Sequence, residues 1–245
     1  METKVIFEDE DLLVLDKPSG MIVNKADTTK DHVTVQDWVE KRFKIEDLRI
    51  KNNDESDFYK RSGIVHRLDK ETSGILLVAK TLEAFINLQA QFKERKVQKT
   101  YIALAHGEIE PAEGEISVSV GRLPWNRKRF GVIAEGREST TEYKVLSIKY
   151  YVSGKEREPL SLVELKPKTG RTHQIRVHLQ YIKHPIFADP LYAGRKTSKR
   201  DRKLLPRIFL HASKISFSHP AASEMMSFES PLPEDLNNFL LRLKA

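Results

Sequence analysis

The stretch His66–Gly74 reads His-Arg-Leu-Asp-Lys-Glu-Thr-Ser-Gly, and the apolar run Ile75–Ala79 follows it directly. Ile64 and Val65 precede it, so apolar residues flank this polar loop on both sides. A short apolar run beside a polar turn is typical of a buried strand. We therefore predict an active-site loop held on a buried strand, with Asp69 as its functional carboxylate.

Composition indicates a folded protein without disulfides. The chain has 245 residues, 39% of them hydrophobic, so it can bury the core of one large domain or two small ones. It contains no cysteine, which excludes disulfide bonds and thiolate metal sites. The N-terminus has no apolar signal core, and no apolar run approaches the roughly 18 residues of a membrane span. We expect a cytoplasmic protein.

The charge balance favours a polyanionic partner, because 42 basic residues outnumber 35 acidic ones and give a net charge of +7. Arg195–Arg207 contains seven basic residues against the single acid Asp201. A second basic segment combines cations that could follow phosphates with aromatic rings that could stack on bases. It comprises Arg122, Trp125, Arg127, Lys128, Arg129 and Phe130. Either segment alone could be a solvated loop, but two in one basic chain favour RNA or DNA.

Hairpins and helices both occur, which predicts an α+β architecture. Strands are expected at Lys4–Phe7, Leu12–Asp16, Thr100–Ala105, Glu115–Val120, Thr140–Ile148 and Leu160–Lys166, the last two joined by a polar turn at Ser153–Pro159. Helices are expected after caps at Thr34 and Thr81, over Thr172–Ile182, and at the C-terminal end with Leu236, Phe239, Leu240 and Leu243 on one face. The polar stretch Ile45–Gly63 is expected to be an exposed excursion. No repeat or linker is evident, so we expect one catalytic domain spanning residues 1–245.

The common cofactor motifs are missing from the sequence. His173 and His178 are five residues apart, not the four that would place both on one helical face for a metal, and no acid is interleaved. No Gly-x-Ser-x-Gly elbow and no glycine-rich phosphate loop occurs. In Lys166–Leu179, Gly170 marks a strand-to-helix passage, and Arg171 is expected to open the helix. What survives is chemistry by a carboxylate with arginines and an aromatic hydroxyl, which needs neither metal nor cofactor.

The order of short motifs resembles the RluA-type family of RNA pseudouridine synthases over almost the whole chain. The motifs are Asp16-Lys17-Pro18-Ser19-Gly20, His66-Arg67-Leu68-Asp69 with Thr72-Ser73-Gly74, Lys99-Thr100-Tyr101, Gly170–His178, and Leu210-His211-Ala212 with Phe217, His219 and Pro220. The resemblance implies the pseudouridine synthase catalytic fold, a mixed, mainly antiparallel central sheet flanked by helices, with a basic active-site cleft. It also implies that uridine in RNA is isomerised to pseudouridine.

The resemblance assigns roles to individual residues. Asp69 would be the essential carboxylate, acting either as a nucleophile on the ribose or as a base that gives a glycal. Arg171 would pair with Asp69 and keep it ionised, and Tyr101 would lie against the uracil and help to remove the proton from carbon 5. The target uridine must leave its stack, and Arg67 would fill the vacated space.

Other positions carry weaker expectations. Leu210 would pack against Tyr101 and the base, although a lone leucine in a strand is more often plain core. His66 belongs with Arg67 and Leu210 among the candidate substrate-binding residues, but it is also read, like His173 and His211, as a structural histidine. Local hydrogen bonds and a permissive backbone in Thr72, Ser73 and Gly74 would shape the loop. Ala188 stands where many relatives have glycine, which puts the turn there in doubt.

Members of this family often carry a small N-terminal RNA-binding domain, and we expect none here because the motifs begin within the first twenty residues. The basic segments would then select the RNA through Arg127, Lys128, Arg129, Lys199, Arg200 and Arg202. Single-stranded loops or hairpins suit such contacts better than an A-form duplex, whose major groove is closed to side chains. We expect a monomer acting on large-subunit ribosomal RNA first and transfer RNA second.

Two other classes of function remain open. A non-catalytic RNA-binding or ribosome-assembly factor would be expected to have lost Asp69, Tyr101 or Arg171, and all three are present. An N-glycosidase using Asp69 as nucleophile would need a second carboxylate or base to activate water. Glu71 is the nearest acid in sequence, and we expect it to point to solvent.

Overall fold

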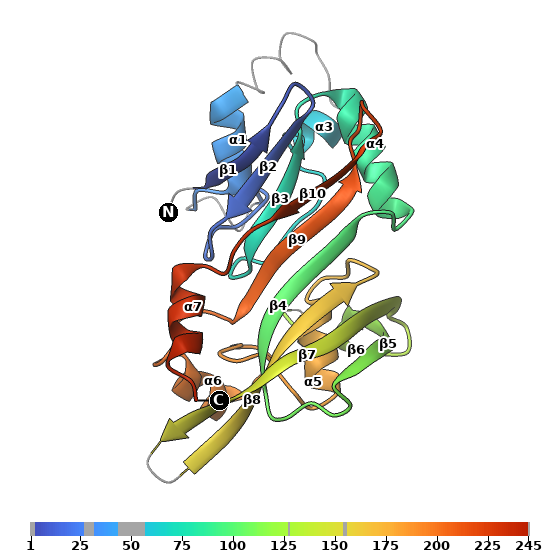
Figure 1. Ribbon diagram of the computed structural model, residues 1–245. Helices are drawn as coiled ribbons and strands as arrows, with labels where there is room; N and C mark the ends of the chain where they lie inside the picture. Colours follow the sequence, from blue (N-terminus) through green and yellow to red (C-terminus); the bar gives the residue numbers. More distant parts are fainter. Residues whose placement is uncertain (1–2, 27–31, 44–56, 127, 154–155, 245) are drawn as a thin grey trace. The chain divides into compact units, whose positions relative to one another are not determined.

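The computed structural model describes residues 3–26, 32–43, 57–126, 128–153 and 156–244 (Figure 1). The chain divides into two compact units. Unit 1 comprises residues 1–97 and 214–230, and unit 2 comprises residues 98–213 and 231–245. No helix in the described ranges is long and apolar enough to cross a membrane.

Unit 1 contains an antiparallel arrangement of β1 (Lys4–Glu8), β2 (Leu12–Lys17) and β3 (Ser73–Ala79), with Leu15 opposite Leu76. Strand β9 (Leu210–Ser218) enters this unit at Lys214, and its second half pairs antiparallel with β10 (Met225–Glu229). The helices are α1 (Val35–Phe43), α3 (Asp57–Lys60) and α4 (Leu82–Lys93). A core including Val14, Ile75, Leu77, Phe85 and Phe217 holds these elements together.

The expected hairpin and the first two helices are confirmed in unit 1. The hydroxyl of Thr34 accepts from the backbone N–H of Asp37, and the hydroxyl of Thr81 accepts from that of Ala84. Each hydroxyl satisfies a backbone donor that the first turn of a helix leaves unpaired.

The expectation of an exposed excursion over Ile45–Gly63 is wrong where it can be compared. Residues 45–56 lie outside the described ranges, but Asp57–Lys60 forms α3, and Phe58 is only 5% exposed. Its ring packs edge-on against Phe85 of α4, with ring centroids 5.7 Å apart. One aromatic residue in a polar stretch was enough to anchor the end of this segment in the core.

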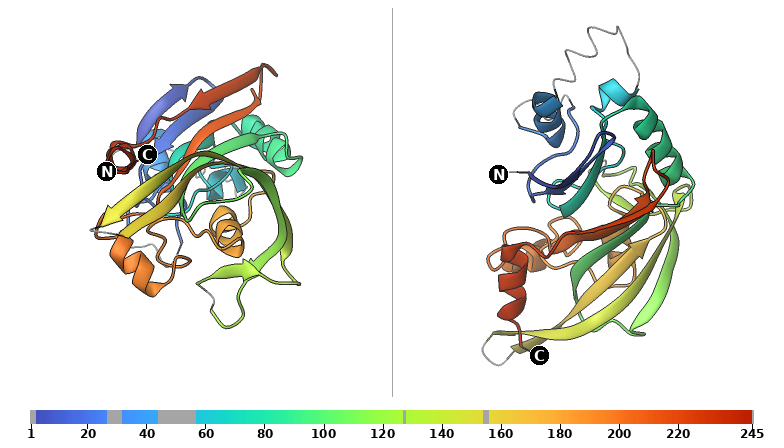
Figure 2. Two further views of the ribbon diagram at one scale, coloured as in Figure 1. Left: turned by 60° about the horizontal axis from the view of Figure 1, so that its bottom comes forward. Right: turned by 45° about the horizontal axis from the view of Figure 1, so that its top comes forward.

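Unit 2 is built on five antiparallel strands in the order β4-β8-β7-β5-β6. They are β4 (Gln98–His106), β5 (Glu113–Arg122), β6 (Phe130–Val132), β7 (Arg137–Ser153) and β8 (Glu156–Pro167). Helix α5 (Gln174–Tyr181) lies inside the curve of these strands and contacts β5 to β8 (Figure 2). Its Ile175 and Leu179 share a core with Leu160, Val163 and Leu165. Helices α6 (Arg195–Asp201) and α7 (Glu234–Leu241) complete the unit.

The α+β class with mainly antiparallel strands is confirmed, and so is the apolar face of the C-terminal helix, on which Leu236 and Phe239 are buried. Three details differ from expectation. Helix α5 begins at Gln174, two residues later than Thr172. Strands β7 and β8 continue to Ser153 and from Glu156, so the turn is shorter than the expected one. The basic segment near Arg195 forms a helix where a loop was expected.

Candidate active site

The loop that carries Asp69 precedes β3, in which every residue from Ser73 to Ala79 is buried. Asp69 itself is half-buried, and its carbonyl accepts from the N–H of Thr72 at 3.1 Å. The loop docks on the end of β2 through its own carbonyls. Gly20 donates its N–H to Lys70 O at 2.8 Å, and the Ser19 hydroxyl donates to Glu71 O at 2.8 Å. The predicted arrangement, a polar loop held on a buried strand, is confirmed.

Lys17 is the main internal support of this loop. The side chain is fully buried, and its ammonium donates to Pro18 O at 2.9 Å, Met21 O at 2.8 Å and Lys70 O at 3.1 Å. A buried ammonium is tolerated only with such partners. Sequence analysis quoted Lys17 within a motif without giving it this role. Its position, at the end of an apolar strand and just before a Pro-x-Gly turn, was the available signal.

His66 has a structural place in unit 1. Its Nε2 accepts from the N–H of Leu77 at 3.0 Å, and its ring lies 4.8 Å from that of Phe92, measured between centroids. The imidazole thus braces the loop against β3, as expected of a structural histidine. Arg67 next to it is exposed.

The expectation for Thr72, Ser73 and Gly74 is met in part. Gly74 has a φ of 113°, a conformation that favours glycine. Thr72, however, is buried, and among the described residues its hydroxyl has no hydrogen-bond partner. The methyl group of Thr72 therefore fills space here, and the expected local hydrogen bond from its hydroxyl is wrong.

Tyr101 lies on β4 in unit 2, opposite Leu165 of β8. It is half-buried and packs against the core cluster that includes Leu210, which is 3% exposed. Tyr101 and Leu210 therefore belong to one packed region of this unit, as the resemblance implies.

Arg171 lies in the turn between β8 and α5, and Gln174 holds that turn together. The Gln174 Oε1 accepts from the Thr169 hydroxyl at 2.7 Å and from the Arg171 N–H at 3.0 Å. Its Nε2 donates to Thr140 O at 3.0 Å and to the Thr141 hydroxyl at 2.9 Å. The Arg171 Nε donates to Glu138 O at 3.2 Å. Gln174 was quoted in the motif but given no function.

Lys99 is a second residue without an assigned role at this turn. Its ammonium lies 3.4 Å from Thr169 O, beside Gly170, and burial lowers its pKa to about 8. Because Asp69 belongs to unit 1 while Lys99, Tyr101 and Arg171 belong to unit 2, the pairing of Asp69 with Arg171 stays a prediction.

The two histidines considered as metal ligands have separate partners. His173 Nδ1 lies 2.8 Å from the Tyr192 hydroxyl, and His178 Nε2 lies 2.8 Å from the Ser139 hydroxyl. Among the residues that the structure describes, no group of three or more His, Cys, Asp or Glu side chains could hold a metal ion.

The basic segment between β5 and β6 combines exposed and packed side chains. Trp125 is 78% exposed, and Lys128 is exposed beside it. The Arg129 guanidinium, in contrast, lies 5.2 Å from the centroid of the Tyr192 ring. Arg127 falls outside the described residues.

The second basic segment is only partly available to a ligand. Lys199 is exposed, but the Arg200 Nη2 pairs with Glu158 Oε2 at 2.7 Å, and the Arg202 Nη1 donates to Ala188 O at 3.2 Å. Ala188 has a φ of 61°, in the left-handed region that glycine prefers, which accounts for its departure from the family pattern. Contacts from α6 hold its strained backbone, since Asp201 also accepts from the Ala188 N–H.

Comparison with known proteins identifies the family. Residues 11–181 match the RNA pseudouridylate synthase family, a span that includes the Asp69 loop, Tyr101 and the Arg171 turn. The chain belongs to this family, and the assignment made from its motifs is confirmed.

Relatives and solved structures agree with that assignment. The chain is 37% identical over 245 residues to the ribosomal large subunit pseudouridine synthase D of Nitrosomonas europaea, covering 98% of this chain and 65% of the relative. It is 40% identical to an uncharacterized RNA pseudouridine synthase of Aquifex aeolicus, covering 94% of this chain and 69% of the relative. The structure of human RNA pseudouridylate synthase domain containing 1 superposes with a TM-score of 0.73 at 26% identity, over 97% of this chain and 87% of that one. The chain thus spans slightly less than two thirds of the length of the Nitrosomonas protein.

Proposed function

We propose that this protein is an RNA pseudouridine synthase that isomerises specific uridines in structured RNA, with large-subunit ribosomal RNA as the first candidate and transfer RNA as the second. The family match over residues 11–181 carries the proposal, because it contains both the Asp69 loop and the Arg171 turn. Relatives named for the large ribosomal subunit support the choice of RNA.

Asp69 is the essential carboxylate of the proposed reaction. The bond between uracil N1 and ribose C1′ breaks, the base turns, a bond forms between C5 and C1′, and the proton on C5 leaves to solvent. Asp69 begins the sequence either by adding to C1′ or by removing a ribose proton to give a glycal. Both routes need an ionised carboxylate, which a guanidinium at Arg171 would favour.

Tyr101 and Leu210 form the proposed wall against the uracil. A half-buried aromatic ring can lie against the base, and its hydroxyl can help to remove the proton from C5. The target uridine must first leave its stack, and the exposed Arg67 beside the Asp69 loop suits the role of filling the vacated position.

The remaining expectations belong to the same proposal. Residues 1–245 would act as one catalytic domain with a basic active-site cleft, as a monomer, without a metal or other cofactor. A cytoplasmic location follows if the substrate is ribosomal or transfer RNA.

The test compares the wild-type protein with Asp69→Asn, a change of nearly equal shape. Each is incubated with total RNA from cells that lack the gene, and pseudouridine is mapped chemically at single-nucleotide resolution. We expect the wild type to create a defined site and Asp69→Asn to create none. If both proteins bind RNA but neither creates a site, the function is that of an RNA-binding or assembly factor. Loss of a base without pseudouridine would instead indicate a glycosidase.

A further inference from the structure

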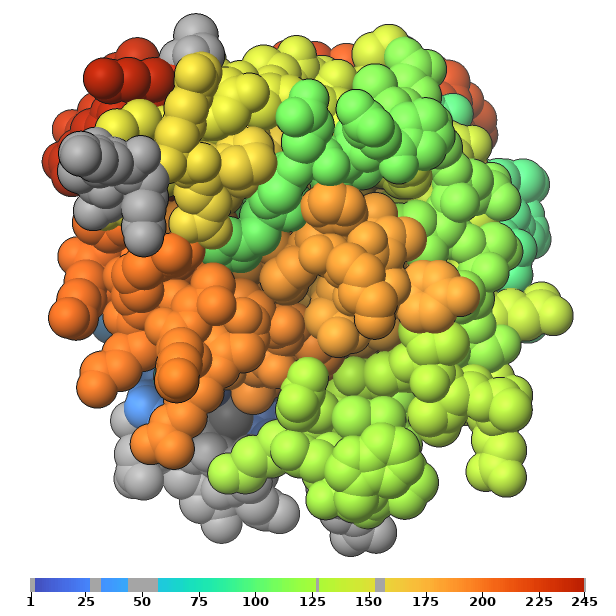
Figure 3. Space-filling model, turned by 90° about the horizontal axis from the view of Figure 1, so that it is seen from below, coloured from blue at the N-terminus to red at the C-terminus, as the bar shows by residue number. Residues whose placement is uncertain are grey.

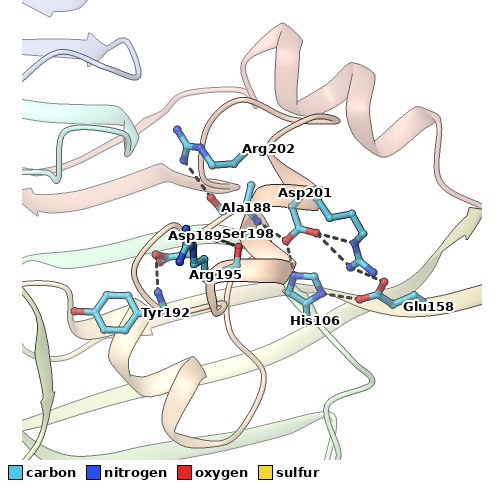
Figure 4. A network of polar contacts seen from close by, with 10 residues as sticks. His106, Glu158, Ala188, Asp189, Tyr192, Arg195, Ser198, Asp201 and Arg202 are labelled. Carbon is cyan, nitrogen blue, oxygen red and sulfur yellow. Dashed lines mark hydrogen bonds and ion pairs between the residues drawn. The ribbon is translucent and has the colours of Figure 1, made fainter.

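Helix α6 is attached to the rest of unit 2 by the buried carboxylate of Asp201. This carboxylate is fully buried, and its Oδ2 lies 2.8 Å from His106 Nε2 and 3.2 Å from the Ala188 N–H nitrogen. On the other side of the ring, His106 Nδ1 lies 2.9 Å from Glu158 Oε1 of β8 (Figure 4). The imidazole at the end of β4 therefore joins α6 to β8.

The geometry requires His106 to be an imidazolium. An ionised carboxylate can only accept hydrogen bonds, so both ring nitrogens must carry hydrogen to satisfy Glu158 and Asp201 together. Burial alone would lower the pKa of His106, but the hydrogen bonds and charges of Asp201 and Glu158 outweigh it and raise the pKa. The other charged or titratable groups here are Arg200, which pairs with Glu158, and His184, whose Nδ1 bonds the His106 carbonyl oxygen.

The opposite side of α6 presents cations to solvent. Ser198, Asp201 and Leu205 are buried, whereas the basic residues three or four positions apart on the other side are exposed. These exposed cations, which we call the outer basic face, are Arg195, Lys196, Lys199 and Lys203. Arg200 and Arg202 do not belong to it, because both are held in internal contacts.

The outer basic face adjoins the other basic segment of unit 2. Tyr192, two residues before Gly194 at the start of α6, donates its hydroxyl region to that segment: the Phe130 N–H bonds the Tyr192 oxygen at 3.1 Å, and Arg129 covers its ring. In Figure 3 the orange α6 segment and the yellow-green β5–β6 segment are exposed on the same face. Cations from both segments can therefore follow one phosphate backbone.

We propose that the outer basic face of α6 binds RNA phosphates and that His106 is a positioning residue, which holds this face in place by bridging Asp201 and Glu158. The inference rests on the proposed function for the identity of the polyanion. Because the bridge needs the imidazolium, the contribution of α6 to RNA binding is present at low pH. It is lost as the pH rises above the ordinary histidine value, through the raised pKa of His106.

The experiment measures the affinity of the full chain for a fluorescein-labelled RNA hairpin as a function of KCl concentration. The outer-face variant replaces Arg195, Lys196, Lys199 and Lys203 with Gln. Its matched control replaces four other exposed cations, Lys4, Lys41, Lys93 and Arg242, with Gln, so that the net charge changes equally. We expect the outer-face variant to lose affinity about tenfold and to lose about 0.7–0.9 of salt slope per phosphate contact, while the control changes much less.

His106→Gln tests the positioning role. It should lose most of the same salt slope, and combining it with the outer-face variant should add little further loss. In the wild type, raising the pH from about 6 to about 9 should reduce the slope, because surface lysines keep their charge over that range. The pH effect should be absent from both variants, a result that a merely structural histidine would not produce.

The wild-type pH series keeps the inference testable if His106→Gln fails to fold. Equal slopes for the outer-face variant and its charge-matched control would overturn the phosphate contact. A wild-type slope that does not change with pH, or full additivity of the two changes, would overturn the role of His106. Pseudouridine formation on the same preparations reports the proposed function separately, since it depends on Asp69 rather than on α6.

Discussion

The Asp69 loop of unit 1 and the Arg171 turn of unit 2 are each held by one buried polar side chain, but the two supports differ in charge. Lys17 carries an ammonium that can only donate, and it gathers three backbone carbonyls. Gln174 carries a neutral amide that both donates and accepts, and it joins N–H, hydroxyl and carbonyl groups around the turn. The comparison teaches that the Asp69 loop depends on a buried charge, whereas the Arg171 turn depends on several smaller neutral contacts.

Lys17→Met should have the largest effect on this comparison. It keeps the length of the side chain but leaves Pro18 O and Met21 O without this donor, while Lys70 O keeps its bond from Gly20. Orphaned buried acceptors of this kind cost about 3 kcal/mol of unfolding free energy together. Urea denaturation measures the loss, and Lys70→Met, at an exposed side chain, is the control. Equal stability of the two variants would show that the ammonium does not support the loop.

Gln174→Met should be milder and confined to unit 2. The change removes four hydrogen bonds, but Thr140 O still accepts from the Lys168 N–H, so few groups are left unpaired. We expect a loss of about 2 kcal/mol and faster hydrogen exchange in the turn around Arg171. Gln180→Met, on the same helix, should change neither quantity. Faster exchange in the Asp69 loop as well would contradict separate supports for the two sites.

Acid should weaken the Arg171 turn more than the Asp69 loop, because α5 also carries His178. Burial lowers the pKa of His178 to about 4, so the unfolded chain binds a proton that the folded chain excludes as the pH falls below the ordinary histidine value. The expected loss is about 1.5 kcal/mol at about pH 5.5. His178→Gln, whose amide nitrogen can replace Nε2 opposite Ser139, should remove this part of the pH dependence. His106 acts with the opposite sign, since its pKa is raised, and it is unchanged in both proteins. An identical pH profile for the two proteins would show that His178 is not the group responsible.

The sequence carried the elements that depend on local patterns. The apolar run after Gly74 indicated β3, and hydroxyls at Thr34 and Thr81 indicated the starts of α1 and α4. The ordered motifs indicated the family. These signals are local or rest on a pattern that many chains share, which is why they could be read without coordinates.

The supports of the two loops were not predicted, because their partners are distant or are backbone atoms. A lysine in a sequence is read as a solvated charge, yet Lys17 is buried and bonds a carbonyl 53 residues away. The basic run at Arg195 was read as a loop, since its helical spacing becomes evident only once Ser198 and Asp201 are known to be buried. Arg200 and Arg202 were grouped with Lys199 as RNA contacts, although their partners Glu158 and Ala188 lie 42 and 14 residues away.

Tritium release tests the central claim most directly, because it follows the C5 hydrogen that the proposed reaction must displace. The protein is incubated with large-subunit ribosomal RNA transcribed in vitro with uridine tritiated at carbon 5. We expect the wild type to release one tritium for each pseudouridine formed, and Asp69→Asn to release none while binding the same RNA with unchanged affinity. Release by Asp69→Asn at the wild-type rate would contradict the account.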